Sequence, residues 1–123
     1  MGILKFTLHK SADEDYYFRL RNIGDEIMLT SRNYSSFRNC INEIRCLKEY
    51  RDFKLEEEPQ FAACQHRFAL RSSNGRAIAM SQNYISRTRM SQDVKVVTEA
   101  MREADIEDCS TTVRFFRKVN TKI

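Results

Sequence analysis

The sequence predicts an α+β protein built from two tandem β-β-β-α-β repeats. The first observation is internal repetition: with a shift of fifty residues, segment 18–36 aligns without gaps on segment 68–86, and seven of the nineteen positions are identical. The second observation is a change of hydrophobic periodicity within each copy, from the period of a strand to that of a helix. Repeats of this length are supersecondary units that bury their apolar faces against one another. We therefore expect a first repeat over 1–58 and a second over 59–123, together forming one compact, pseudo-symmetric domain.

Three strands are expected at the start of each repeat. In the first repeat, apolar and polar residues alternate over 4–9 and over 16–21, and a third strand follows over 26–31. In the second repeat, strands matching the second and third are expected over 66–71 and 76–81, while residues 59–64 link the copies and their sequence predicts no definite element. Alternation with a period of two places one side of each strand against a core and the other side in solvent.

Turn and cap residues then lead into one helix per repeat. The Asn-Gly pair at 74–75 favours a hairpin turn because both residues tolerate a positive φ. Ser36 and Ser86 are expected N-caps, since a serine hydroxyl accepts a hydrogen bond from an unsatisfied backbone N–H. The apolar stripes at helical spacing are Phe37, Ile41, Ile44 and Leu47 in the first helix, and Met90, Val94, Val97, Met101 and Ala104 in the second. Closing strands are expected over 52–57 and 111–119.

Segment 70–86, LRSSNGRAIAMSQNYIS, resembles the signature of the YegP-like family, an uncharacterised bacterial family of short tandem repeats. The shared pattern is Phe-x-Leu, then Asn-Gly, then Ser-x-x-Tyr-x-Ser before a helix, and the resemblance covers both copies. The first copy departs from it by having Gly24-Asp25 in place of Asn-Gly, and the second helix has Gln92-Asp93 where the family has Asn-Gly. The resemblance implies one antiparallel sheet, two helices packed on one face, and last strands exchanged between the repeats. It implies no activity.

Composition excludes several classes of protein. With 41% hydrophobic and 31% charged residues the chain is globular rather than disordered. No apolar run approaches the roughly 18 residues that a transmembrane helix needs, and the first residues alternate like a strand rather than forming a signal peptide. We therefore expect a cytoplasmic protein. The four cysteines contain no CxxC pair, which favours buried reduced thiols over a metal site or disulfides.

The side of the predicted sheet that faces away from the helices carries the candidate binding residues. They are Tyr17, Arg19, Arg21, Arg67 and Arg71, which alternate with the apolar residues of their strands. We expect a non-catalytic interaction module whose exposed sheet face, with the small residues Ala69, Ala77 and Ala79, binds an unidentified protein partner or a second copy of the chain.

Nucleic-acid binding by the arginines of the second repeat is the alternative. Residues 59–123 carry 11 basic and 6 acidic side chains, against 10 and 11 in residues 1–58, and segment 59–92 holds five arginines and no acidic residue. Arginine and aromatic side chains on a sheet can hold phosphates and stack on bases, although only Tyr17 is aromatic here and no RNP1 pattern is present.

Catalysis is the weakest hypothesis. His9 and His66 have no repeated Asp, Ser or Cys companion, and the isolated glycines form no phosphate-binding loop. We expect no enzyme, no cofactor and no metal. The repeated Ser-x-Asn-Tyr-x-Ser element, at 31–36 and 81–86, has two interpretations: a pair of ligand pockets, or tyrosines packed on the helices with serines that satisfy turn and cap hydrogen bonds. We favour the second interpretation.

Overall fold

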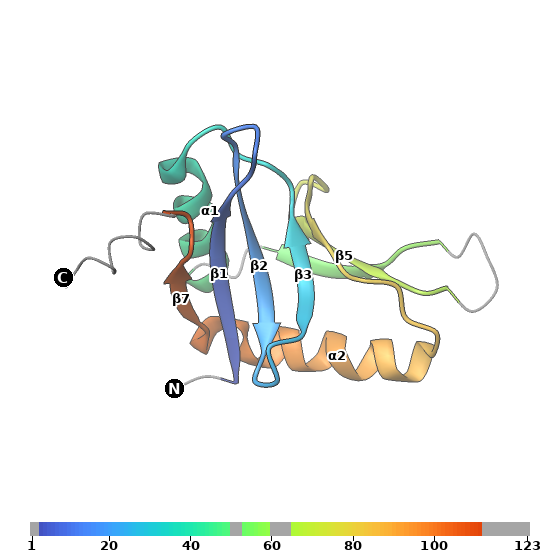
Figure 1. The fold of residues 1–123 in the computed structure, drawn as a ribbon. Helices are drawn as coiled ribbons and strands as arrows, with labels where there is room; N and C mark the ends of the chain where they lie inside the picture. The colour runs from blue at the N-terminus through green and yellow to red at the C-terminus, as the bar shows by residue number, and fades with distance from the viewer. Residues whose placement is uncertain (1–2, 50–52, 60–64, 112–123) are drawn as a thin grey trace.

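The computed structural model of the chain describes residues 3–49, 53–59 and 65–111. This part has an α+β architecture with one seven-stranded sheet and two α-helices (Figure 1). The strands are β1 (Leu4–Lys10), β2 (Tyr16–Asn22), β3 (Ile27–Ser31), β4 (Phe53–Glu57), β5 (Phe68–Ser72), β6 (Ala77–Met80) and β7 (Asp105–Asp108). The helices are α1 (Phe37–Glu49) and α2 (Arg87–Ala100), and a 3₁₀ turn, Met101–Glu103, links α2 to β7.

The sheet is mixed, with the strand order β4-β5-β6-β3-β2-β1-β7. Five neighbouring pairs are antiparallel, but β7 runs parallel to β1, with Lys5 opposite Asp105 and Leu8 opposite Asp108. The expectation of a purely antiparallel sheet is therefore wrong. Helix α2 carries the chain from β6 to the far edge of the sheet, where β7 enters in the same direction as β1.

The hairpins β2–β3 and β5–β6 have the same geometry despite different turn sequences. Each contains a register shift at the same place, after Leu20 in the first and after Leu70 in the second. The turn residue with positive φ is Asp25 in one hairpin and Gly75 in the other, and each donates its backbone N–H to the carbonyl of the last residue of the preceding strand. Aspartate is one of the few side chains that tolerate this conformation.

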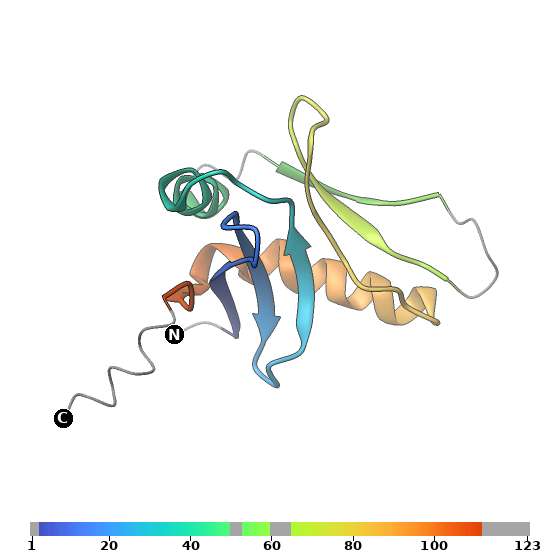
Figure 2. The same cartoon turned by 45° about the horizontal axis from the view of Figure 1, so that its top comes forward.

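Both helices begin where the serine caps predict. The Ser36 hydroxyl accepts the backbone N–H of Asn39 at 3.0 Å, and the Ser86 hydroxyl accepts that of Arg89 at 3.2 Å. In Figure 1 both helices lie behind β1, β2 and β3, and Figure 2 shows the same arrangement from above. The outer face of these three strands is therefore without helical cover in the described part of the chain.

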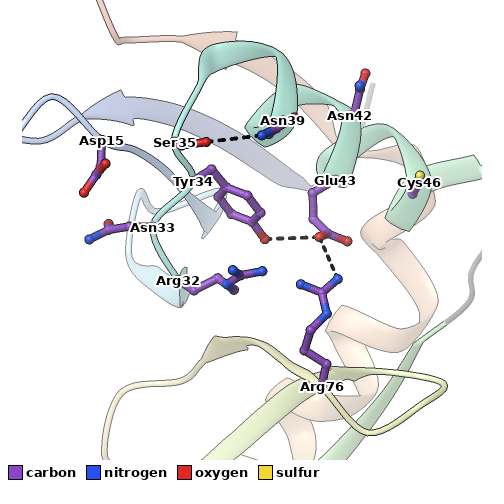
Figure 3. A pocket seen from close by; sticks show the side chains of 10 residues that line it. All are labelled: Asp15, Arg32, Asn33, Tyr34, Ser35, Asn39, Asn42, Glu43, Cys46 and Arg76. Carbon is purple, nitrogen blue, oxygen red and sulfur yellow. Dashed lines mark hydrogen bonds and ion pairs between the residues drawn. The ribbon is translucent and has the colours of Figure 1, made fainter.

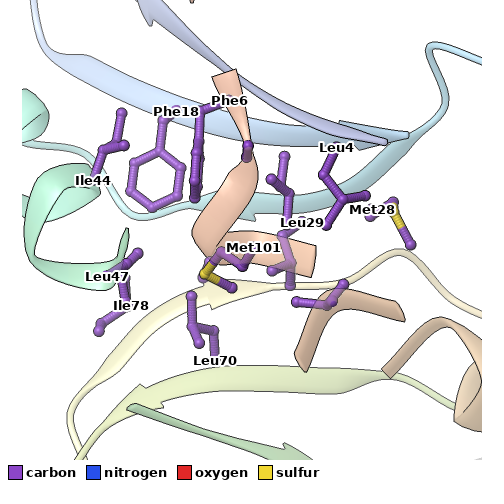
Figure 4. Packing of buried hydrophobic residues seen from close by; sticks show 14 of the residues in the cluster. Leu4, Phe6, Phe18, Met28, Leu29, Ile44, Leu47, Leu70, Ile78 and Met101 are labelled. Atoms are coloured by element: carbon purple, nitrogen blue, oxygen red, sulfur yellow. The ribbon is translucent and has the colours of Figure 1, made fainter. Parts of the chain in front are cut away.

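One hydrophobic cluster joins the two helices to the inner faces of both ends of the sheet. Phe18 and Leu70 come from strands on opposite sides of the β3–β6 junction, and Ile44 and Val97 come from the two helices; all four are fully buried. Met101, which is 1% exposed, lies among side chains from both ends of the sheet (Figure 4). The elements therefore depend on each other for burial.

The closing part of the second half differs from expectation. A strand at 105–108 follows α2 directly, where the sequence pattern indicated none. The strand expected over 111–119 lies, apart from Thr111, outside the described residues, as does segment 60–64. No helix in the described part of the chain is long and apolar enough to cross a membrane.

The serine caps give a first test. We expect Ser36→Ala and Ser86→Ala each to lower the free energy of unfolding by about 1 kcal/mol, because each leaves a helix N–H without its acceptor. The two losses add in the double variant, since the caps share no partner. Chemical denaturation measures them, with Ser73→Ala in the exposed β5–β6 turn as the matched control. Cap variants as stable as the control would contradict the assignment.

Candidate functional site

The candidate residues of β2 form a compact group on the outer face of the sheet. The register pairs Tyr17 with His9 of β1, and their rings stack with centroids 5.1 Å apart. The Arg19 guanidinium lies 5.4 Å from the centre of the Tyr17 ring. Tyr17 is thus held between an imidazole and a cation, and we call these three residues, His9, Tyr17 and Arg19, the tyrosine cluster.

Arg19 keeps unused hydrogen-bonding capacity in this cluster. Its Nε is buried and has no hydrogen-bond partner among the described residues. A buried donor without an acceptor costs free energy, which an incoming acceptor would recover. The pKa of His9 is lowered, first by burial of the ring and then by the positive charges of Arg19 and Arg21, while Glu107 opposes the shift. The neutral imidazole is therefore favoured beside Tyr17.

Arg21 lies next to the cluster, but its side chain is already bound within the chain. Its Nε donates to the Thr7 hydroxyl at 3.3 Å and its Nη1 donates to the Asp25 carbonyl at 3.1 Å. The side chain is only 17% exposed. Arg21 therefore supports the surface around Tyr17 more than it offers a free cation.

The two candidates of the second half form a separate group. Arg71 of β5 contacts Glu56 at 3.2 Å and Glu58 at 2.9 Å, so its charge is compensated inside the fold. Arg67 lies just before β5, and its carbonyl accepts the Glu58 backbone N–H. Since β6 and β3 separate β5 from β2, Arg71 and Arg19 lie about 14 Å apart across the sheet. The five candidates therefore do not make one continuous patch.

The small residues expected on this face are mostly covered. Ala69 is fully buried and Ala79 is 5% exposed, leaving Ala77 as the exposed member of the three. Ala79 points inward because it pairs with the buried Leu70. Simple alternation from Ala77 would place the Ala79 side chain on the outer face. The register shift in β6 turns it toward the core instead.

The strand-to-helix junctions have matching hydrogen bonds in the two halves. Ser31 and Ser81 accept the backbone N–H groups of Phe18 and Phe68, both at 2.9 Å. Burial raises the pKa of both Tyr34 and Tyr84, whose hydroxyls donate to carboxylates of the following helix. These contacts account structurally for the Ser-x-Asn-Tyr-x-Ser element.

A polar cavity of about 690 Å³ opens at the first of these junctions (Figure 3). Glu43 of α1 lies in its wall, where it accepts from the Tyr34 hydroxyl at 3.3 Å and from Arg76 at 3.4 Å. Arg76 comes from the β5–β6 turn, so a residue of the second half of the chain lines the cavity at the junction of the first half. At the other junction Glu26, from the β2–β3 turn, lies 3.9 Å from Arg89.

The sequence named Tyr17 and Arg19 as candidates but did not indicate the groups that contact them or line the cavity. His9 had no expected binding role, and only the β1–β2 register brings it against Tyr17. Arg76 was counted within an acid-free segment, although Glu43 lies 33 residues away in the sequence and 3.4 Å away in space. No local pattern signals either contact.

Comparison with known proteins finds relatives without an assigned function. A family model described as a domain of unknown function, DUF1508, matches residues 62–108. A UPF0339 protein of Pseudomonas aeruginosa is 31% identical over 106 residues, which cover 85% of this chain and 96% of that protein.

Two solved structures are similar in fold. The solution structure of a UPF0339 protein from Shewanella oneidensis has a TM-score of 0.76 at 23% identity, covering 88% of this chain and 92% of that one. The solution structure of yegP from E. coli, a protein of unknown function, has a TM-score of 0.75 at 21% identity, covering 91% and 97%. Both support the α+β fold.

The tyrosine cluster predicts a titration that NMR can follow. We expect His9 to titrate below about 6.5, and Arg19→Gln to raise its pKa because a neighbouring positive charge is removed. A lowered pKa favours the neutral ring in the folded state. The contribution of His9 to stability is therefore present above about pH 6.5 and is lost as the pH falls through the folded pKa. If Arg19→Gln left the pKa of His9 unchanged, the result would contradict the proximity of Arg19 to His9 in the tyrosine cluster.

The junction tyrosines form a matched pair of variants. We expect Tyr84→Phe to lower the free energy of unfolding by about 1–2 kcal/mol, because it removes the 2.7 Å hydrogen bond to the largely buried Asp93 carboxylate. Tyr34→Phe should cost less, since its bond to Glu43 is 3.3 Å long. Thermal or chemical unfolding compares them. The reverse order of the two losses would show that these hydroxyls do not contribute as their distances indicate.

Proposed function

We propose that this chain, which belongs to the UPF0339 family of YegP-like proteins, is a non-catalytic interaction module that binds protein through the outer face of β1, β2 and β3. The observation that carries the proposal is the tyrosine cluster: Tyr17 contacts both His9 and Arg19 on a face that no helix covers in the described residues. Tyrosine and arginine are the residue types most often found to dominate binding energy at protein interfaces.

The chemistry of the cluster supports this role. Two neighbours restrict the Tyr17 ring before any partner arrives, which reduces the entropy lost on binding. The Arg19 guanidinium has no ion pair among the described residues, so its charge is available to a partner's carbonyl or carboxylate. The described residues include no group of histidine, cysteine and acidic side chains able to hold a metal ion.

Nucleic-acid binding by the second half has less support. Arg71 and Arg76 lie within ion-pair distance of Glu56, Glu58 and Glu43. The arginines at the start of α2 also have carboxylate neighbours: Arg87 contacts Glu57, and Arg89 lies near Asp93 and Glu26. Arginines already neutralised inside the fold contribute less to the release of counterions from a phosphate backbone.

The same proposal treats the two halves as tandem β-β-β-α-β copies that exchange their last strands. In support, β4, which follows α1, pairs with β5 of the second half, and β7, which follows α2, pairs with β1 of the first half. The equivalent turns, register shifts and serine hydrogen bonds described above also support it. We further propose that the module works in the cytoplasm. Cys40 is a buried thiol, but Cys46 and Cys109 are exposed, so the expected burial is wrong for these two; exposed thiols stay reduced in a reducing compartment.

Site-specific photocrosslinking tests the binding face. A benzophenone amino acid replaces Thr30, which pairs with Arg19 on the same face, or the matched control Ser73 in the exposed β5–β6 turn. In cells that make the protein, we expect a crosslinked protein adduct from position 30 and none from position 73. Tyr17→Ala combined with Arg19→Ala should reduce the adduct about tenfold, as expected for residues that dominate an interface.

The pattern of adducts identifies the kind of partner or rejects the proposal. An adduct that also forms with the purified protein alone identifies the occupant as a second copy of the chain, whereas an adduct found only in cells identifies a different protein. No adduct at position 30, or equal adducts at both positions with no effect of the double substitution, would reject the outer face as the binding surface.

A further inference from the structure

The cavity at the β3–α1 junction contains two opposite charges without ion-pair partners. The Arg32 guanidinium lies 5.1 Å from the centre of the Tyr34 ring, and no carboxylate of the described residues pairs with it. Asp15 also lines the cavity, and its carboxylate has no hydrogen bond or ion pair within the described part of the chain (Figure 3). One polar cavity thus holds an uncompensated cation and an uncompensated anion that do not pair with each other.

The other charges of the cavity are already compensated. Glu43 accepts from both the Tyr34 hydroxyl and Arg76, so its carboxylate balances Arg76. The first turns of α1 add the amide side chains of Asn39 and Asn42 to the lining of the cavity (Figure 3). Amides of this kind donate and accept hydrogen bonds, which suits a small, polar and uncharged segment of a ligand.

The fold does not require Asp15 or Arg32. Fifty residues further along the chain, Gln65 and Gln82 stand at the corresponding positions, beside a junction that keeps the same backbone and tyrosine hydrogen bonds. Two neutral glutamines therefore satisfy the structural demands of such a junction. The two charges at the first junction call for an explanation outside folding, and a ligand with complementary charges supplies one.

We propose that this cavity binds a small zwitterion, a free α-amino acid or short peptide, with the ligand carboxylate on Arg32 and the ligand ammonium on Asp15. Arginine is suited to bind a carboxylate with two parallel hydrogen bonds, and an aspartate accepts from an ammonium group. The cavity volume lies within the range of small-molecule sites, and its polar walls suit a ligand without a large apolar part. The site is separate from the tyrosine cluster and does not depend on it.

An NMR titration of the full chain tests this site with defined probes. The probes are L-alanine and diglycine, with propionate as the carboxylate-only control and alanine methyl ester as the ammonium-only control. We expect saturable shifts of the Arg32 and Asn39 amides by both zwitterions, with dissociation constants of about 1 mM or lower. Propionate and the ester should bind at least about tenfold more weakly, because each lacks one of the two charge contacts.

The variants copy the other junction, so they should fold normally. Arg32→Gln and Asp15→Gln introduce the residue found fifty positions later, and each should weaken zwitterion binding about tenfold or more. Lys95→Gln, an exposed charge on α2, is the matched control and should bind as the original chain does.

Three results would overturn the proposal. They are no saturable shift with either zwitterion, binding of propionate as tight as that of L-alanine, and unchanged affinity in both cavity variants. The second result would show a simple anion site, and the third would place the ligand elsewhere on the protein.

Discussion

A single shared hydrophobic core is the constraint on which the other features depend. The elements on each side of the β3–β6 junction contribute apolar side chains to one cluster, so neither side buries its apolar surface alone. Phe18 and Phe68 bring the two ends of the sheet into one cluster, and Met101 at the end of α2 fills space between them. Because both helices cover this inner side, no helix in the described part of the chain covers the outer face of β1, β2 and β3, where Tyr17 and Arg19 lie.

Local spacing predicted much of the fold, and long-range pairing determined the rest. Ser36 and Ser86 cap their helices as expected, because a cap needs only a hydroxyl beside a helix start. The parallel strand Asp105–Asp108 was not predictable, since it has one apolar residue and its position depends on β1. Arg71 follows the buried Leu70 in its strand, but the carboxylate of Glu56 that compensates its charge comes from a different strand.

Some side-chain contacts occur in both halves of the chain, and others occur in one half alone. Features present in both, such as the hydrogen bonds of Ser31 and Ser81, are needed wherever the same backbone is built. The functional proposals rest on features that occur in one half but not in the other. Tyr17 of the outer face corresponds to Arg67, and Arg32 of the cavity corresponds to Gln82. The sequence differences between the halves are therefore a guide to function in a family whose role is not assigned.

Native-state hydrogen exchange tests the shared core most directly. The slowest backbone amides of β2 and β5 lie on opposite sides of the β3–β6 junction. If the core is shared, neither side opens without the other, and we predict that these amides exchange with the same free energy, equal to that of global unfolding. Exchange of one strand at a clearly lower free energy, while the other remains protected, would show two separate cores and contradict this account.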